Sequence, residues 1–197
     1  DLNRLLTAQR GPDDNIQRKY SYDYDRWGNR WDQAVVAGSG FGSPHAFDTG
    51  TNRLIDTGYG YDASGNLSSN GPSTTYSYSM ENLMITFGAS VTYAYDAQGR
   101  RVRKTISGTV TDYFYSGSEV IAEKQGSAWT DYIFFGGQRI AIQTGSTLST
   151  TTFLHGDHLG SVRLTTDSSG NTVGTCDYEP FGEVQADCSA LGTTYRF

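Results

Sequence analysis

The chain has 197 residues, 24 of them glycine and 14 tyrosine, and a formal net charge of −6. Its length suits one compact domain or a section of a larger one. The acidic balance, with a sequence pI near 4.9, argues against a nucleic-acid partner, because affinity for a phosphate backbone comes from a cationic surface. Abundant tyrosine, threonine and glycine favour short strands joined by tight turns, so we expect an all-β chain.

The first residues of the given sequence do not have the pattern of a targeting signal, although one could have been lost upstream. No stretch approaches the roughly 18 consecutive apolar residues of a membrane span, and DLNRLLTAQR (1–10) lacks the apolar segment of a signal peptide. We therefore expect no membrane span. Because the sequence begins with Asp1 rather than Met and stops abruptly at Phe197, we expect an excerpt or a processed product of a longer protein.

One unit, Tyr-x-Tyr-Asp-x-x-Gly-Asn/Arg, recurs along the chain. In chain order its clearest copies are YDYDRWGN (22–29), YGYDASGN (59–66) and YAYDAQGR (93–100). Weaker copies are HAFDTGTNRL (45–54), YSYSMENL (76–83), YFYSGSEV (113–120), YIFFGGQR (132–139), FLHGDHLGSVR (153–163) and CDYEPFGE (176–183). Apart from one step of about double length that contains the copy at 45–54, successive copies lie 17 to 23 residues apart. Such a period is typical of a repeat architecture.

Each copy predicts a β-hairpin. Tyr93 and Tyr95 are two positions apart, so both rings project from one face of a strand. Asp96 suits the first position of a type I turn, and Gly99 suits the left-handed position that follows. RVRKTI (101–106) then alternates as the return strand. A unit this short cannot bury its aromatic row alone, so the hairpins must pair with their neighbours into a long, coiled antiparallel β-sheet.

The same logic assigns roles to residues in the other copies. The predicted turn residues are Asp25, Gly28, Asp62, Gly65, Asp96, Gly99, Asp157, Gly160 and Gly182. The predicted aromatic rows are Tyr22, Tyr24, Tyr59, Tyr61, Tyr76, Tyr78, Tyr93, Tyr95, Tyr113, Tyr115, Tyr132, Phe134 and Tyr178. We interpret these tyrosines as packing residues rather than a sugar-binding platform. We expect buried phenol hydroxyls to bond Asp, Asn and Arg side chains of neighbouring turns.

Two cysteines, Cys176 and Cys188, are the only ones in the chain. Because they lie 12 positions apart, they could close a loop through a disulfide in an oxidising compartment. Two free buried thiols are the alternative. A usual structural zinc site is disfavoured, because it needs more ligands of this kind.

With these units in tandem, the chain resembles the RHS/YD-repeat family of bacterial polymorphic toxins, insecticidal toxin complexes, wall-associated proteins and animal teneurins. The segment from His155 to Glu183, with DHLGS, TDSSGN and YEPFGE, resembles the start of the RHS-repeat-associated core. Residues 1–152 are accordingly assigned to YD/RHS repeats and 153–197 to the RHS-associated core segment, continuous in one domain. The resemblance implies a β-spiral that often closes into a shell around a toxin domain. The aspartates of its self-cleaving members fall beyond Phe197, so that activity is not carried over.

DHLGS (157–161) brings an Asp, a His and a Ser together, but it aligns with a repeat turn. A catalytic triad is disfavoured, because its members usually come from separate segments. His155, Asp157 and His158 offer metal donors, yet the two histidines fall on opposite faces of a regular strand, so metal binding is the weaker alternative. DSSGN (167–171) is likewise a turn that lacks the further acidic ligands of a calcium loop. We expect no catalytic residue, metal or cofactor.

Three functions follow from these patterns. The first is a non-catalytic structural scaffold or shell segment of a secreted or cell-surface bacterial protein, whose partners are other repeat segments and an enclosed toxin domain. The second is a subunit of an extracellular filament, in which identical copies self-assemble through unpaired strand edges. The third is glycan or receptor binding through the exposed aromatic residues Trp27, Trp31 and Trp129.

Overall fold

The computed structural model describes residues 3–40, 42, 44–71, 74–145, 150–184 and 188–193. Its described strands pair in antiparallel fashion, which confirms the all-β prediction. The chain divides into two compact units, Asp1–Ala89 and Ser90–Phe197. The boundary expected at 152/153 concerns the type of repeat, and both that boundary and the continuity of the two parts in one domain stay predictions. Among the described residues, no helix is long and apolar enough to span a membrane.

The strands of the first unit form one three-stranded sheet and two further hairpins. Strands β1 (Thr7–Arg10), β2 (Arg18–Tyr24) and β3 (Arg30–Ala37) pair in chain order. Two hairpins follow: β4 (Tyr59–Tyr61) with β5 (Leu67–Asn70), and β6 (Tyr76–Tyr78) with β7 (Met84–Phe87). Between the sheet and these hairpins, Phe47 and Leu54 form an isolated bridge. The degenerate copy at 45–54 is therefore also a chain reversal.

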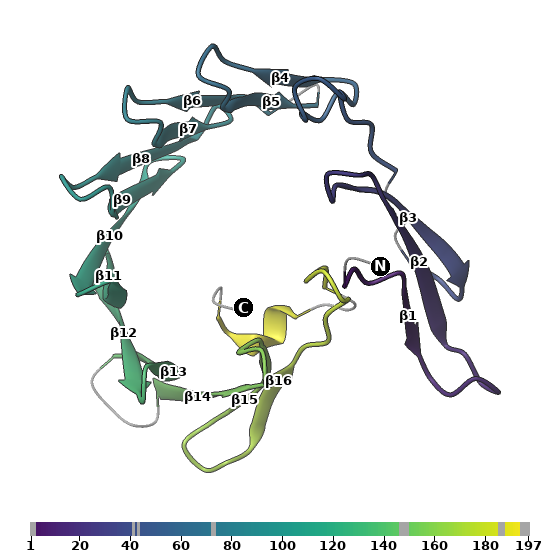
Figure 1. Ribbon diagram of the computed structural model, residues 1–197. Coiled ribbons are helices and arrows are strands. Elements are labelled where there is room, and N and C mark those ends of the chain that lie inside the picture. The colour runs from purple at the N-terminus through teal and green to yellow at the C-terminus, as the bar shows by residue number, and fades with distance from the viewer. Residues whose placement is uncertain are drawn as a thin grey trace. The chain divides into compact units, whose positions relative to one another are not determined.

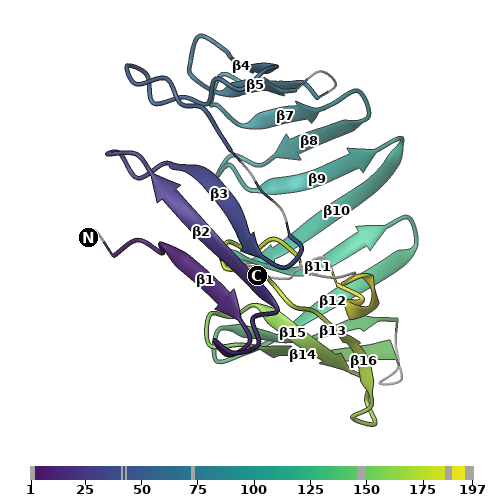
Figure 2. The same ribbon diagram turned by 90° about the vertical axis from the view of Figure 1, so that its right-hand side faces the viewer.

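The second unit is built around consecutive pairing. Each strand pairs with the next in sequence, from β8 to β16. The strands are β8 (Val91–Tyr95), β9 (Arg101–Ile106), β10 (Thr109–Ser116), β11 (Glu119–Gln125), β12 (Ala128–Phe135), β13 (Gln138–Thr144), β14 (Thr151–Gly156), β15 (Val162–Thr166) and β16 (Thr172–Thr175). The 3-10 helix η2 (Ser189–Leu191) follows them and contacts β16. Figures 1 and 2 show these strands side by side in chain order.

The hairpins share one irregularity of register, which lies directly before the second aromatic residue of the Tyr-x-Tyr or Tyr-x-Phe pair. It occurs at Asp23/Tyr24, Gly60/Tyr61, Ser77/Tyr78, Ala94/Tyr95, Phe114/Tyr115 and Ile133/Phe134. Such a bulge fits a turn whose last residue has a left-handed backbone, as Gly99 does with φ of 77°. The bulge bends the strand and increases its twist, so the aromatic residue beside the turn is re-aimed relative to a regular strand.

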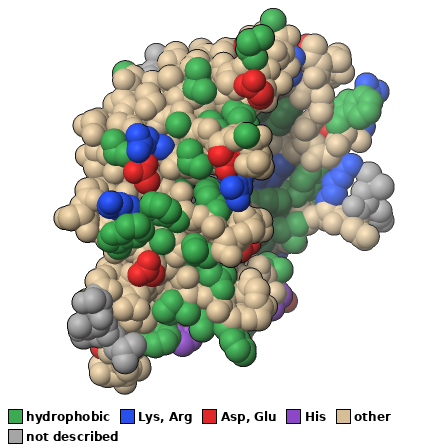
Figure 3. Space-filling model, turned by 90° about the vertical axis from the view of Figure 1, so that its left-hand side faces the viewer, with side chains coloured by type: hydrophobic (Ala, Val, Ile, Leu, Met, Phe, Trp, Pro, Cys, Tyr) green, Lys and Arg blue, Asp and Glu red, His purple; other side chains and the backbone are tan. Residues whose placement is uncertain are grey.

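Buried tyrosines take the place of a large aliphatic core. Tyr20, Tyr22, Tyr113 and Tyr132 are all buried. In the second unit Val162, Cys176, Cys188 and Leu191 form a small apolar cluster, in which Cys176 and Cys188 are joined by a disulfide. Other apolar side chains are exposed, and Figure 3 shows hydrophobic side chains lying beside acidic and basic ones on the face that it displays. Hydrogen bonds and packing contacts within and between hairpins therefore contribute much of the stability of the fold.

Candidate functional site: the joint between successive hairpins

The turn at Asp96 is closed by its own side chain. The backbone N–H of Asp96 donates to Arg100 O at 3.0 Å, and that of Gly99 donates to Asp96 O at 3.0 Å. Asp96 Oδ1 accepts the backbone N–H groups of Gln98 at 3.0 Å and Arg100 at 2.9 Å. The other carboxylate oxygen, Oδ2, accepts Arg100 Nε at 2.7 Å. One carboxylate thus fixes both the turn and the residue that follows it.

The same turn recurs with changes of residue type. The backbone pair that closes it is present at Asp25/Gly28, Asp62/Gly65, Asp157/Gly160, Asp167/Gly170 and Glu179/Gly182. At Ser79 a hydroxyl replaces the carboxylate, and Asn82, with φ of 60°, replaces the glycine. The copies at 113–120 and 132–139 differ, because Ser116 pairs with Glu119 and Phe135 with Gln138, which leaves two-residue turns. Those two turns are shorter than the repeat pattern implies.

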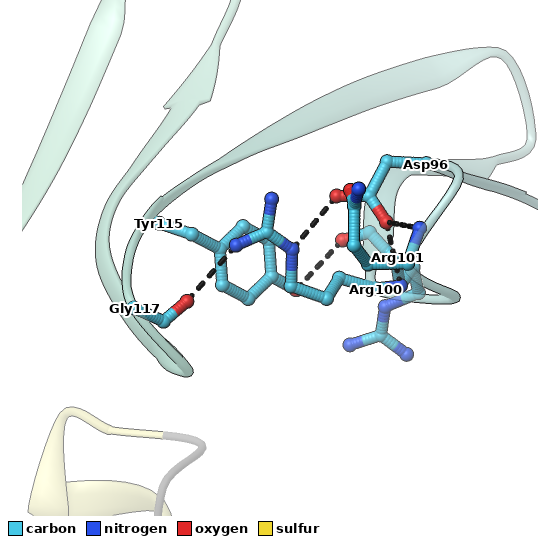
Figure 4. Close-up of polar contacts among 6 residues, drawn as sticks. Asp96, Arg100, Arg101, Tyr115 and Gly117 are labelled. Carbon is cyan, nitrogen blue, oxygen red and sulfur yellow. Dashed lines mark hydrogen bonds and ion pairs between the residues drawn. The ribbon is translucent and has the colours of Figure 1, made fainter.

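Arg100 also reaches forward to the next hairpin. Its Nη1 donates to Gly117 O at 2.9 Å, and its guanidinium carbon lies 4.9 Å from the centre of the Tyr115 ring. In the opposite direction, Tyr115 Oη donates to Arg101 O at 2.9 Å. Figure 4 shows both contacts converging between the turn of one hairpin and that of its successor. We call this reciprocal pair of contacts the hairpin joint.

The joint is repeated elsewhere in the chain. In the first unit, Arg4 Nη1 donates to Asp25 O at 2.6 Å while Tyr24 Oη donates to Leu5 O at 2.9 Å. Further along, Asn66 Nδ2 donates to Asn82 Oδ1 at 2.8 Å while Tyr78 Oη donates to Leu67 O at 2.9 Å. In the second unit, Tyr178 Oη donates to Val162 O at 2.9 Å, which repeats the tyrosine contact of the joint. In these copies the tyrosine before a turn thus bonds a carbonyl at or just before the start of an earlier strand.

The turns and the joint shift the pKa values of their titratable residues. Hydrogen bonds from the Asn66 side chain and the turn backbone lower the pKa of Asp62 below its usual 3.8, despite partial desolvation. At Asp96, desolvation raises the pKa, but the bonds from Arg100 and Gln98 outweigh it and the pKa is lowered. Desolvation raises the pKa of Tyr115 above 10.0 although Arg101 and Arg100 oppose this. The phenol is therefore protonated at neutral pH and able to donate.

The arrangement of the joint corrects one expectation. For Tyr24, Tyr78, Tyr115 and Tyr178, the hydroxyl bonds a backbone carbonyl of an earlier segment of the chain, not a turn side chain. Every residue has such a carbonyl, so the sequence offers no signal for the partner. The forward contact of Arg4, Asn66 and Arg100 was missed as well. Its signal was visible, because Asn or Arg recurs directly after the turn glycine in the repeat.

The remaining predicted residues lie in the following places. The tyrosine and phenylalanine pairs lie on the strands that precede their turns, and Tyr178 lies at a bridge with Val184. The Asp157 carboxylate accepts the backbone N–H groups of Leu159 and Ser161, as a turn residue does. His155 Nε2 lies 3.0 Å from Thr166 Oγ1. DHLGS is therefore another turn of the series.

Serial hairpins that are coupled to their neighbours through a repeated joint define a β-repeat protein. A family model described as Teneurin YD-shell matches residues 3–191, and the chain belongs to this family. The match confirms the YD-repeat resemblance, and the fold and the family together support a structural shell role.

Known relatives are much longer than this chain. It is 27% identical over 190 residues to the "tRNA3(Ser)-specific nuclease WapA" of Bacillus spizizenii, covering 89% of this chain and 8% of the relative. The "tRNA nuclease WapA" of Bacillus subtilis is 28% identical with the same coverage. The chain spans less than a tenth of the length of each relative. The nuclease activity in these names therefore describes the full-length relatives and not the part that this chain matches.

Solved structures share the fold. TcdB2-TccC3 without its hypervariable C-terminal region aligns with a TM-score of 0.66 and 14% identity, over 91% of this chain and 11% of that one. TcdB2-TccC3 aligns with a TM-score of 0.65 and 16% identity, over 94% and 11%. At this identity the likeness shows the YD-shell fold.

Proposed function

We propose that this chain is a non-catalytic wall segment of a bacterial YD-repeat shell that encloses a toxin domain in a secreted or cell-surface protein. The observation that carries the proposal is the hairpin joint. The motif residues Asp96, Gly99, Arg100 and Tyr115 have their side chains or backbone engaged in closing a turn or in linking two hairpins. A repeated motif that is used in this way supports a mechanical role.

The match to the Teneurin YD-shell model and the fold shared with the two TcdB2-TccC3 structures support the enclosure that we propose. The names of the nuclease relatives do not conflict with a wall role, because this chain matches only 8% of each relative. Partners of the segment would be other YD-repeat segments of the same polypeptide and the enclosed domain.

The test uses the full-length polypeptide that contains this segment. Opening one joint by Arg100→Ala with Tyr115→Leu should make an enclosed domain more sensitive to added protease, while Arg26→Ala, which alters an arginine stacked within its own turn, should not. Enclosure would be refuted if protease digested the domain as fast in the unaltered polypeptide as in the Arg100→Ala/Tyr115→Leu and Arg26→Ala variants. Separately, the purified 197-residue chain should leave tRNA intact, and cleavage that copurifies with it would refute the non-catalytic assignment.

A further inference from the structure

An open groove of about 730 Å³ lies on the second unit beside the start of β12 and the end of β13. Its lining residues are Ser127, Ala128, Trp129, Asp131, Gln143, Thr144 and Gly145. The volume falls within the range of about 300–1,000 Å³ that is usual for small-molecule sites. None of the residues that make the hairpin joint lines the groove, so the inference below does not rest on the wall role proposed above.

Strand geometry places the distinctive side chains on one face. Trp129 and Asp131 are two positions apart on β12, and Asp131 is directly opposite Gln143 on β13. Alternate residues of a strand and direct cross-strand partners project from the same face. An indole, a carboxylate and an amide are therefore presented together.

The indole is held in position before any ligand arrives. The ring centres of Trp129 and Phe114 lie 5.1 Å apart, and Lys124 Nζ lies 5.3 Å from the Trp129 ring. Trp129 nevertheless remains 43% exposed. Gln143 Nε2 donates to Gly145 O at 3.2 Å, which orients the amide. An aromatic surface fixed in this way loses little entropy when a ligand stacks on it.

The chemistry of the lining selects a class of ligand. The C–H face of a sugar ring stacks on an aromatic ring, while its hydroxyls need acceptors and donors around the rim. Asp131 accepts such bonds, and Gln143, Ser127 and Thr144 both donate and accept. The lining contains one carboxylate, Asp131, and Lys124 lies outside it, with its ammonium 5.3 Å from the centre of the Trp129 ring; along the lining a phosphorylated or sulfated ligand would therefore meet a carboxylate rather than a cation, which disfavours it. We propose that this groove binds a neutral oligosaccharide of hexose units, stacked on Trp129 and hydrogen-bonded by Asp131 and Gln143.

The test is a titration of the purified chain with maltohexaose, cellohexaose, laminarihexaose and chitohexaose, followed by calorimetry and by the NMR signal of the Trp129 indole N–H. At least one of the four should bind with a Kd of about 1 mM or tighter. Trp129→Leu should weaken that binding roughly tenfold or more, and Asp131→Asn by several-fold. Trp31→Leu is the matched control, because Trp31 is 44% exposed but belongs to β3 and does not line the groove.

Thermal unfolding of each variant separates loss of binding from loss of fold. Should Trp129→Leu unfold, Asp131→Asn and Gln143→Ala carry the test, since both alter side chains at the groove rim. The proposal is overturned if none of the four hexaoses binds. It is equally overturned if Trp31→Leu weakens binding as much as the groove variants do.

Discussion

Two substitutions of Tyr115 dissect the hairpin joint, because its hydroxyl and its ring make different contacts. Tyr115→Phe removes only the hydroxyl that donates to Arg101 O at 2.9 Å. An intramolecular hydrogen bond contributes about 0.5–1.5 kcal/mol net, and we expect a value near the lower end because this bond is exposed to solvent. Tyr115→Leu also removes the ring that lies 4.9 Å from the Arg100 guanidinium, and should cost more.

Combining each substitution with Arg100→Ala isolates the stacking. A cation–π contact at an exposed site contributes about 0.5–1 kcal/mol, so Arg100→Ala and Tyr115→Leu should be non-additive by about that amount. Arg100→Ala and Tyr115→Phe should add to within about 0.5 kcal/mol, because phenylalanine keeps the ring under the guanidinium.

Urea unfolding of the purified chain, followed by circular dichroism, gives the free energies of these variants and of their double mutants. Arg26→Ala is the control, since Arg26 stacks at 4.8 Å on Trp27 in its own turn. Equal coupling of Arg100→Ala to the Phe and Leu variants would contradict the assignment of ring and hydroxyl. An unchanged free energy of unfolding in Tyr115→Phe would show that the bond to Arg101 does not stabilise the chain.

Further predictions concern the turns and the disulfide. Gly170→Ala should lower the free energy of unfolding in urea by about 1 kcal/mol, because alanine is strained at a φ of 83°. No atom lies within 4 Å of the new Cβ, so the backbone strain alone accounts for this cost. Gly156→Ala, at a position without a left-handed φ, should change the free energy of unfolding very little. The pKa values of Asp62 and Asp167 lie below 3.8 because the Asn66 and Asn171 amides donate to them, so the stability they give is complete above pH 3.8 and is lost as the pH falls through the folded pKa. In NMR titrations Asn66→Ala should raise the pKa of Asp62 alone, and a matching rise at Asp167 would refute a local cause. Reduction of the Cys176–Cys188 bond should lower the free energy of unfolding by about 3 kcal/mol from loop closure alone. A double Cys→Ala variant should unfold at one urea midpoint with and without reductant, and a shift would show that the reductant acts elsewhere.

The features that the sequence predicted well are those with local causes. Asp62 and Gly65 are three positions apart, and the backbone bond between them and the left-handed φ of Gly65 follow from their own chemistry. Alternating Tyr93 and Tyr95 similarly indicated β8. The two-residue turn at Gly117 departs from the repeat because YFYSGSEV lacks the Asp-x-x-Gly spacing, so Ser116 pairs with Glu119 instead.

What the sequence could not predict depends on contacts between hairpins. The acceptor for Tyr115 is the main-chain oxygen of Arg101, and that for Tyr78 belongs to Leu67, although the two residues share no side-chain chemistry. The groove at Trp129 is equally non-local, because Gln143 reaches Asp131 through strand pairing rather than sequence proximity. Trp129 was recognised as an exposed aromatic residue, but its polar neighbours were not.

The hydroxyl of Tyr115 reaches back by 14 positions and that of Tyr78 by 11, so each joint closes within a short stretch of chain. Duplicating such a stretch in a gene would copy a tyrosine donor and its carbonyl acceptor together. The added hairpin could then form the same hydrogen bonds with the hairpins before and after it. Deleting one such stretch would place the donor of the following hairpin beside an equivalent acceptor in the preceding hairpin. The number of hairpins can therefore change by whole repeats, during evolution or engineering, without compensating substitutions where neighbouring hairpins meet.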